Sequence, residues 1–194
     1  MLEFRRLETG HKALSIQRLP VSDKLRNIAE SFCELAENKN LNYQLDIEPD
    51  IEWNTDISCF NKIANNLISN AFKYTPEEGT INVSLKTENQ HLTLSISNSG
   101  KGIAKENLLK IFDRYKILDS FEMNGKNSRN GLGLAICKSM TTLLNGEINV
   151  SSIQNEVTTF IVTLPELSPS QQEADMSRKE YETTPINTNT ESIE

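Results

Sequence analysis

The stretch NKIANNLISNAFKYT, residues 61–75, combines an apolar helical stripe with four asparagines, and the rest of the chain is interpreted outward from it. Apolar residues recur at intervals of three and four from residue 57 to residue 71, which predicts an amphipathic helix. Asp56 stands where it can cap the start of this helix. Asparagine is a mediocre helix former because its amide competes for the backbone, so four of them in one helix suggest a function.

One edge of this predicted helix carries polar groups that suit phosphate and a metal ion. Asn66 and Asn70 are four residues apart and Lys73 follows three later, so the three lie on one face beside the apolar stripe. Amide oxygens are hard ligands for a cation such as Mg²⁺, and a lysine ammonium is a point charge for phosphate. Taken alone, the pattern also fits an ordinary solvated helix face.

The length and the charge distribution of the chain limit its domain number and the kinds of partner it can bind. A chain of 194 residues suits one domain plus some unstructured length. Residues 166–194 hold seven acidic residues against two basic ones, so most of the net charge of −7 lies there and the remainder is nearly neutral. A nucleic-acid-binding surface would need an excess of basic residues, so we expect no such surface on this chain.

Other sequence features predict a soluble, cytoplasmic domain without membrane contact. No run of about 18 apolar residues is present, and the first residues do not form a signal-type segment. The cysteines Cys33, Cys59 and Cys137 have no metal-binding spacing and lie within helical patterns. They are therefore predicted to be small core residues in a reducing compartment.

Hydrophobic periodicity predicts an α+β fold, a two-layer sandwich with a mixed sheet of about five strands and three main helices on one face. Ser22 is predicted to cap the first of these helices. The predicted helices span residues 22–36, 57–74 and 131–144, with a short one at 104–111. The predicted strands lie at 13–19, 41–47, 81–85, 92–96, 148–152 and 158–164, with a short piece around residue 53.

Two glycine loops precede or follow predicted elements. Residues 98–102, NSGKG, end a strand, and Gly131 and Gly133 open a helix. A glycine loop at a helix start places backbone amides and the positive end of the helix dipole together, which suits phosphate. Glycine before a helix is also common simply because the turn requires it. No Walker signature is present in the sequence, which excludes a P-loop.

The order of these motifs resembles the catalytic ATP-binding domain of sensor histidine kinases, in the superfamily shared with gyrase, the mismatch-repair ATPase and a heat-shock chaperone. Residues 66–75 are similar to its N box and residues 98–102 to its first glycine box. Residues 111–115, IFDRY, match the F box, and residues 131–134, GLGL, match the second glycine box. The resemblance covers about residues 20–165.

The resemblance implies Mg-ATP as the bound ligand and assigns roles along the polar edge of the long helix. Asn70 would ligate the Mg²⁺ that bridges the phosphates, with Asn66 beside it, and Lys73 would contact phosphate. Tyr74 would lie along the adenine or ribose, and residues 113–130 would form a mobile ATP lid. The other nucleotide-binding residues that the resemblance implies are Asn98, Gly100, Gly102, Ile103, Arg129, Gly131, Leu132, Gly133, Leu134 and Thr159.

Three positions depart from the family pattern. Asn98 stands where the family usually has an aspartate that accepts a hydrogen bond from the adenine amino group. Asparagine keeps the acceptor oxygen and loses the charge, which weakens such a bond. Arg129 occupies the position of a glycine in the second glycine box, and Val157 stands where glycine is common.

The phosphoacceptor motif of the family, a histidine followed by an acidic residue, is absent, since His11 and His91 lack that context. We expect residues 1–12 to end a dimerisation helix, residues 13–165 to be the catalytic domain, and residues 166–194 to be an acidic disordered tail or linker.

The resulting hypothesis is a histidine kinase catalytic domain that transfers the γ-phosphoryl group of Mg-ATP to a histidine on a dimerisation domain outside this chain, and that does not autophosphorylate alone. A response regulator or receiver domain would be the further partner, and the parent would be an inner-membrane sensor. Two alternatives are a nucleotide-binding regulatory module of the same fold without phosphoryl transfer, and a partner-binding switch like the anti-sigma relatives.

Overall fold

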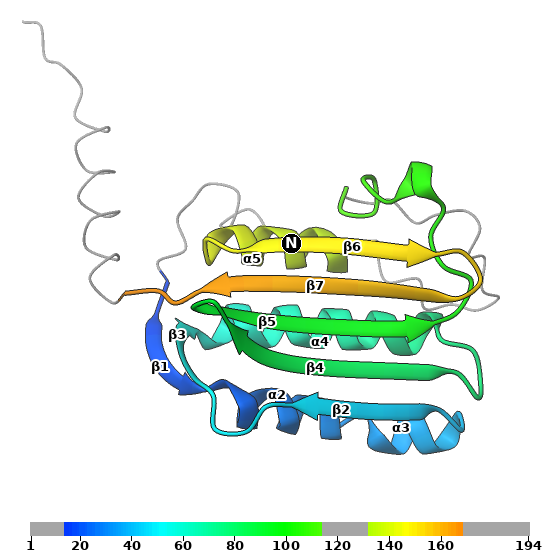
Figure 1. The fold of residues 1–194 in the computed structure, drawn as a ribbon, viewed down its shortest axis with the longest axis horizontal. Helices are drawn as coiled ribbons and strands as arrows, with labels where there is room; N and C mark the ends of the chain where they lie inside the picture. Colours follow the sequence, from blue (N-terminus) through cyan, green and yellow to red (C-terminus); the bar gives the residue numbers. More distant parts are fainter. Residues whose placement is uncertain (1–13, 114–131, 169–194) are drawn as a thin grey trace, which may run out of the picture.

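Alternating apolar residues build one mixed sheet in the computed structural model, which describes residues 14–113 and 132–168 (Figure 1). The strand order is β2-β4-β5-β7-β6, with β2 parallel to β4 and every other pair antiparallel. This confirms the predicted five-stranded mixed sheet. The strands are β2 (Asn42–Ile47), β4 (Thr80–Glu88), β5 (His91–Ser99), β6 (Glu147–Ile153) and β7 (Val157–Pro165).

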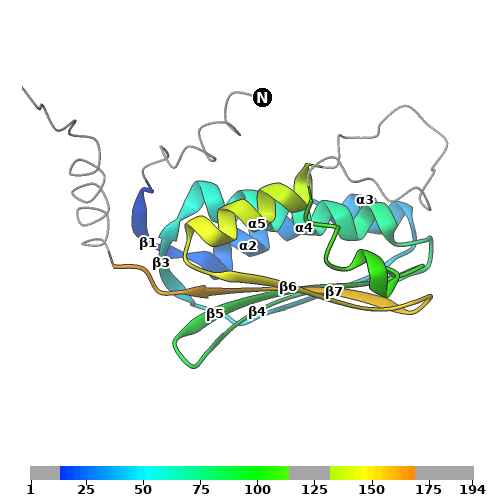
Figure 2. The same ribbon diagram turned by 90° about the horizontal axis from the view of Figure 1, so that it is seen from above.

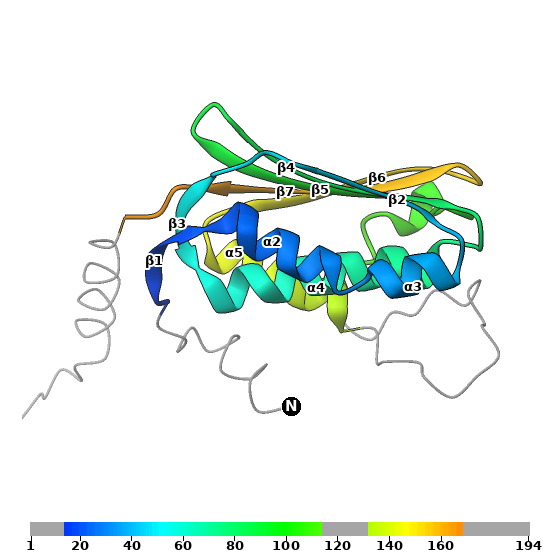
Figure 3. The ribbon, with the colours of Figure 1, turned by 90° about the horizontal axis from the view of Figure 1, so that it is seen from below.

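The helices all lie on one face of this sheet, so the predicted two-layer arrangement is confirmed (Figures 2 and 3). They are α2 (Val21–Glu30), α3 (Cys33–Asn38), α4 (Ile57–Tyr74) and α5 (Gly133–Leu143). The long helix α4 is central, because it packs on β5 and contacts both α2 and α5. None of the described helices is both long and apolar enough to span a bilayer.

The apolar stripe of α4 fills the space between the two layers. Its buried residues follow the predicted spacing of three and four, and they meet the inward side chains of β4 and β5 in one core cluster. The buried residues of α4 are Cys59, Phe60, Ile63, Ala64, Leu67, Ile68, Ala71 and Phe72. Burial of this stripe fixes which edge of the helix is left for polar contacts.

The start of α4 is held by the cap predicted for it. The Asp56 Oδ1 atom accepts hydrogen bonds from the backbone N–H groups of Ser58, at 2.8 Å, and Cys59, at 3.0 Å. Such a cap stabilises a helix by about 1 kcal/mol. The other carboxylate oxygen accepts from the Ser15 N–H at 2.9 Å, so the cap also anchors the first described residues.

The cap predicted at Ser22 is wrong. The helix begins one residue earlier, after Pro20, and has no side-chain cap there. The Ser22 hydroxyl instead donates to the Glu48 carbonyl at 2.6 Å and accepts from the Ile51 N–H at 3.1 Å. It therefore stabilises the turn that leads from β2 into the next strand.

Two further helix predictions need correction. The single helix predicted over residues 22–36 is divided into α2 and α3, and the break holds Phe32, whose ring stacks on Phe72 with 5.1 Å between centroids. The helix predicted over residues 104–111 is only a short 3₁₀ turn, η1 (Lys105–Asn107). Leu109 is 89% exposed, so this segment buries too little apolar surface to favour a longer helix.

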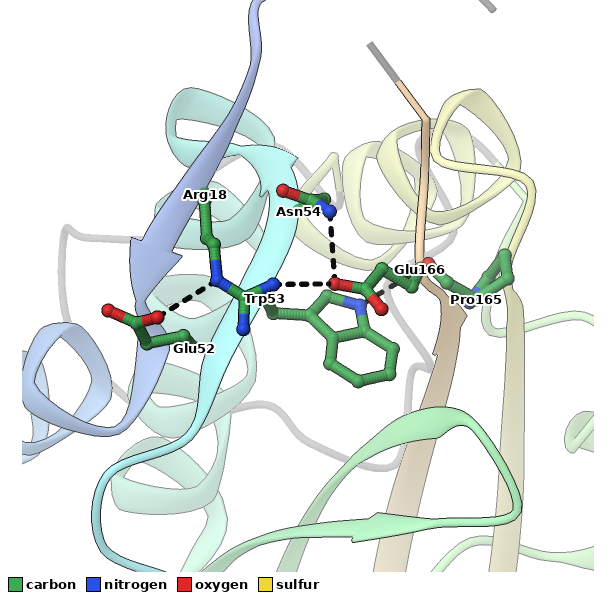
Figure 4. Close-up of polar contacts among 6 residues, drawn as sticks. All are labelled: Arg18, Glu52, Trp53, Asn54, Pro165 and Glu166. Carbon is green, nitrogen blue, oxygen red and sulfur yellow. Dashed lines mark hydrogen bonds and ion pairs between the residues drawn. The ribbon is translucent and has the colours of Figure 1, made fainter.

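A second, smaller sheet joins the two ends of the described fold. Strand β1 (Ile16–Pro20) pairs antiparallel with β3 (Glu52–Asp56), and the chain after β7 lies on the other side of β3 (Figure 4). The Leu167 N–H donates to the Asn54 carbonyl at 3.3 Å, and the Asn54 side chain donates to Glu166 at 3.0 Å. We call β1, β3 and residues 165–167 the junction.

Charged and aromatic side chains complete the junction. The Trp53 indole N–H donates to the Pro165 carbonyl at 3.3 Å (Figure 4). Arg18 pairs with Glu52 at 2.9 Å and with Glu166 at 3.3 Å. Leu167 is only 5% exposed, so the core includes a side chain two residues beyond the boundary predicted at residue 165.

The cysteines mostly follow their prediction. Cys59 and Cys137 are buried in the core, whereas Cys33 is half-buried. Burial raises the pKa of the Cys137 thiol to about 12, so this thiol stays protonated near neutral pH. The core role predicted for Cys59 and Cys137 is confirmed.

Candidate functional site

The polar edge of α4 borders the start of α5. Asn66 and Asn70 are half-buried and Lys73 is exposed. The Asn66 Nδ2 atom donates to the Lys62 carbonyl one turn back, at 2.7 Å. This bond fixes the carboxamide, and its Oδ1 atom lies toward Gly133 at the beginning of α5.

Gly133 lets the two helices approach closely at this point. A Cβ atom added to Gly133 would stand 3.0 Å from the Asn66 Oδ1 atom, which is tighter than an ordinary van der Waals contact. The first N–H groups of a helix of this length are unpaired within the helix and carry its positive dipole end. The Asn66 amide oxygen of α4 and the helix-start amides of α5 therefore converge, which suits a phosphate group with its metal.

The first glycine loop lies between the end of α4 and the β6–β7 turn. Gly100 has a φ of +151°, and a Cβ there would stand 2.7 Å from the Tyr74 carbonyl oxygen. Gly102 has a φ of +70°, and its Cβ would stand 2.7 Å from the Ile153 carbonyl oxygen. Both positions therefore require glycine, because L side chains rarely adopt these conformations and no space is left.

Asn98 lies at the end of β5 on the inner face of the sheet and is buried. It stands opposite Ile81 of β4 and Thr158 of β7. Its Nδ2 atom donates to the Ser99 carbonyl at 3.0 Å, whereas its Oδ1 atom accepts no hydrogen bond from the described residues. Asn98 is buried as a residue, and its Oδ1 atom, unpaired within the described part of the chain, is available for a ligand that enters between the sheet and α4.

The pairing register separates two adjacent threonines of β7. Thr158 is opposite Asn98 and is buried on the inner face, whereas Thr159 is opposite Ser97 and points to the other face. The structure therefore does not bring Thr159 together with the other predicted residues. Thr158, and not Thr159, shares the inner face of the sheet with Asn98.

The end of α4 carries Lys73 and Tyr74. The Lys73 Nζ atom lies over the Tyr74 ring, 4.9 Å from its centroid, which is a cation–π geometry. Gly100 approaches the Tyr74 backbone, so the first glycine loop and the end of α4 meet here. The basic group stands beside an aromatic surface, as expected for a site that takes both a phosphate and a base.

Most of the predicted residues that the structure describes gather at this end of the fold. The Ile103 N–H donates to the Ser152 Oγ atom at 2.9 Å, and Leu132 and Leu134 are half-buried at the start of α5. Arg129, Gly131 and residues 114–130 of the predicted lid lie outside the described residues.

Sequence reasoning missed Thr158 and Ser152. The signal was available, because buried Phe160 and Val162 set the alternation of β7 and place Thr158 on the same face. Ser152 is paired with Thr158 across β6 and β7 and shares that face. The alternation that locates β6 and β7 therefore also assigns both hydroxyls to the inner face.

The chemistry of the donors tests whether a metal fits. Within residues 14–113 and 132–168, no group of three or more His, Cys, Asp or Glu side chains is arranged to hold a metal ion. The oxygens on α4 belong to carboxamides, and Mg²⁺ commonly uses one or two protein oxygens together with substrate phosphates and water. The residues present therefore fit a Mg²⁺ ion that is shared with a phosphate chain.

Known proteins with similar sequences are ATPases and histidine kinases by description or name. Residues 55–168 match the family described as histidine kinase-, DNA gyrase B-, and HSP90-like ATPase. Histidine kinase P4 of Formosa agariphila is 34% identical over 168 residues, which is 85% of this chain and 12% of that protein. Sensor histidine kinase TmoS of Ectopseudomonas mendocina is 31% identical over 170 residues, which is 87% of this chain and 17% of that protein.

Solved structures share the fold. The catalytic domain of histidine kinase ThkA superposes with a TM-score of 0.69 at 24% identity, over 79% of this chain and 97% of that one. Full-length ShkA in complex with AMPPNP superposes with a TM-score of 0.73 at 24% identity, over 86% of this chain and 34% of that one. The chain thus corresponds to about one sixth or less of the length of the two curated relatives and to nearly all of an isolated catalytic domain.

Proposed function

The chain belongs to the histidine kinase-, DNA gyrase B- and HSP90-like ATPase family, and from this membership we propose that it binds Mg-ATP as the catalytic domain of a two-component sensor histidine kinase. The observation that carries the proposal is the convergence of the Asn66 carboxamide with the start of α5 at Gly133. A structure of the similar kinase ShkA was obtained with AMPPNP, a nucleotide of the adenine class.

In this proposal the polar edge of α4 holds the phosphate chain. Asn70 and Asn66 supply amide oxygens, and Lys73 supplies a positive charge to phosphate. The backbone amides from Leu132 to Leu134 would donate to the same group, as helix starts do for anions. A bound Mg²⁺ would neutralise charge on the phosphates, which is its usual part in phosphoryl transfer.

The adenine end of the nucleotide would enter the inner face of the sheet beside Asn98. The Oδ1 atom of Asn98 would accept from the adenine amino group, and Tyr74 would lie along the base or ribose. Gly100 and Gly102 would allow the first glycine loop to close over this end without side chains in the way.

The reaction proposed for the parent protein is transfer of the γ-phosphoryl group to histidine. A histidine ring nitrogen would attack the γ-phosphorus while the bond to the bridging oxygen breaks and ADP leaves with the electron pair. The contribution of this chain is positioning and charge neutralisation, which is what phosphoryl transfer requires of a protein. The acceptor histidine would belong to a dimerisation domain, and a response regulator or receiver domain would receive the group next.

Names of similar proteins support a kinase of the sensor type. Histidine kinase P4, TmoS and the autoinducer 2 sensor kinase/phosphatase LuxQ are signalling kinases by name. We propose that this chain acts on the cytoplasmic side of a sensor of that kind. A regulatory module that binds ATP without transferring phosphate is the second candidate, because Asn98 stands where the resemblance to the histidine kinase family implies an aspartate.

Isothermal titration tests the nucleotide-binding step. The chain is expected to bind ATP in the presence of Mg²⁺ and to bind it more weakly when EDTA removes the metal, because phosphate charge is then left unneutralised. Absence of ATP binding with Mg²⁺ by a folded chain would contradict the proposal. ATP binding that does not change on addition of EDTA would contradict the role of the carboxamides as metal ligands.

A further inference from the structure

We propose that Ser152 on β6 is a specificity-determining positioning residue, whose hydroxyl turns Thr158 into a hydrogen-bond acceptor that selects the adenine amino group. The inference rests on the proposed binding of ATP and adds the means by which the site distinguishes adenine from other purines. Neither residue was among the predicted site residues, and both follow from hydrogen-bond geometry on the inner face of the sheet.

The Ser152 hydroxyl lies at the centre of three polar contacts. Its Oγ atom is 2.9 Å from the backbone nitrogen of Ile103, 3.1 Å from the carbonyl oxygen of Val157 and 2.8 Å from the hydroxyl oxygen of Thr158. A Cβ on Gly102 would stand 3.0 Å from the same Oγ atom, so the glycine loop passes directly over it. The loop, β6 and β7 therefore meet at this one side chain.

Counting protons fixes the direction of each bond. A serine hydroxyl has one hydrogen to donate and two lone pairs that accept. The Ile103 N–H can only donate and the Val157 carbonyl can only accept, so Ser152 accepts from Ile103 and gives its hydrogen to Val157. The remaining lone pair of Ser152 then requires that Thr158 donate its own hydrogen to Ser152.

This arrangement leaves Thr158 with lone pairs and no hydrogen for a ligand. Thr158 is only 6% exposed and stands opposite Asn98 in the register of β5 and β7. Side chains directly opposite on one face of an antiparallel pair are neighbours. Two acceptors, the Thr158 hydroxyl oxygen and the Asn98 Oδ1 atom, are therefore presented at the same place.

Two acceptors favour a donor on the ligand and disfavour an acceptor. Adenine has an amino group at its sixth position, where guanine and hypoxanthine have a carbonyl oxygen. A carbonyl oxygen facing Thr158 would lack a donor unless the Ser152–Thr158 bond broke, which would leave buried groups unpaired. Ser152 thus contributes to base selection through Thr158, without contact with the base.

The test compares ADP with IDP, which carry no γ-phosphate and which differ at the sixth position of the base and in the hydrogen on the adjacent ring nitrogen N1. Both are titrated calorimetrically with Mg²⁺ on the wild-type chain and on Ser152→Ala, Thr158→Val and the double variant. Ser151→Ala is the matched control, because Ser151 is the adjacent hydroxyl on the exposed face of the same strand. Thermal melting of every variant reports the fold independently of binding.

Ser152→Ala frees the Thr158 hydroxyl to rotate and donate, so the ratio of ADP to IDP affinity is expected to fall about fivefold, the scale of one neutral hydrogen bond. Thr158→Val is expected to lower the same ratio, and the double variant to lower it no further, since Ser152 acts through Thr158. Ser151→Ala should retain the wild-type ratio.

Three results would overturn the inference. One is a wild-type ratio in Ser152→Ala, and another is a strictly additive loss in the double variant. If Ser152→Ala does not fold, a wild-type ratio in Thr158→Val overturns it instead. A wild-type chain that is folded and binds neither nucleotide would contradict the proposed function itself, which is a different outcome from binding both without selection.

Discussion

The carboxamide of Asn66 on α4 closes on Gly133, the first residue of α5, so closely that one added methyl group at Gly133 would stand 3.0 Å from the amide oxygen. The Asn66 amide cannot easily move away, because its nitrogen donates to the Lys62 carbonyl at 2.7 Å. Two motifs that are more than sixty residues apart in the sequence thus form one polar surface.

Gly133→Ala is therefore expected to weaken ATP binding without lowering the stability of the fold. The methyl group should displace Asn66 and weaken ATP binding about tenfold, while the fold is retained or gains up to about 1 kcal/mol from the better helix former. Titration and thermal melting of the same samples measure the two effects. Thr142→Ala, an exposed position in the last turn of α5, is the control and should bind normally. Unchanged ATP affinity in Gly133→Ala would contradict the convergence of the two helices on phosphate.

Asn70→Ala should weaken Mg-ATP binding on the order of tenfold or more, the scale of one lost polar contact to a charged group. The matched control is Asn65→Ala, which removes an exposed carboxamide from the same helix. Titration with and without EDTA distinguishes a metal ligand from a phosphate contact, since only the former loses its effect when the metal is removed. Equal affinities for the two variants would refute the metal assignment.

Asn98→Asp should tighten ATP binding by a factor of a few to about tenfold, because a charge-assisted hydrogen bond replaces a neutral one. Asn98→Leu should remove most of the preference for adenine, since the acceptor oxygen is lost. Competition between ATP and GTP on the three proteins measures both effects. An unmodified chain that binds no ATP until Asn98 is replaced by aspartate would favour the regulatory module without transfer activity.

Leu167→Ala should lower the free energy of unfolding by about 2 kcal/mol or more, because this side chain of the junction is buried in the core. Leu109→Ala removes the same atoms from a side chain that is 89% exposed and should change stability by less than about 0.5 kcal/mol. Urea unfolding followed by the fluorescence of Trp53, the single tryptophan, measures both. Equal stability of the two variants would mean that residues beyond β7 do not belong to the folded unit.

The central sheet and α4 were predictable because local periodicity determined them. The apolar residues of α4 keep one spacing over five turns, and the Asp56 cap needs only neighbours in sequence. The positions of Asn66, Asn70 and Lys73 on one edge follow from the same periodicity. These parts of the fold and of the site depend on residues that are close together in the sequence, so they can be predicted from the sequence alone.

The division of the first predicted helix depends on a distant partner. Its apolar spacing continues through residue 32 without interruption, so no local pattern marks the break. The ring of Phe32 packs on Phe72, and the Tyr43 hydroxyl donates to the Ala29 carbonyl at 3.0 Å. A contact between residues forty positions apart cannot be deduced from periodicity.

Pairing between strands carries the other information that was missing. In the junction, β1 pairs with β3, and the chain after Pro165 contacts β3. The local sequence of each segment does not indicate which segment it pairs with. Thr159, one of the predicted site residues, is adjacent to Thr158 on β7. A step of one residue along a strand moves the side chain to the opposite face of the sheet. The Ser152 hydroxyl likewise has a role only because β6 pairs with β7.

Phosphoryl transfer to histidine tests the central claim most directly. The chain is mixed with γ-labelled ATP, Mg²⁺ and a separately purified dimerisation domain that bears the phosphoacceptor histidine of a similar histidine kinase, with Asn70→Ala as the inactive control. The account predicts label on the added domain that is lost in acid and kept in base, and no label on this chain when it is incubated alone. Label on His11 or His91 of this chain, or ATP binding without any label on dimerisation domains from several relatives, would contradict it.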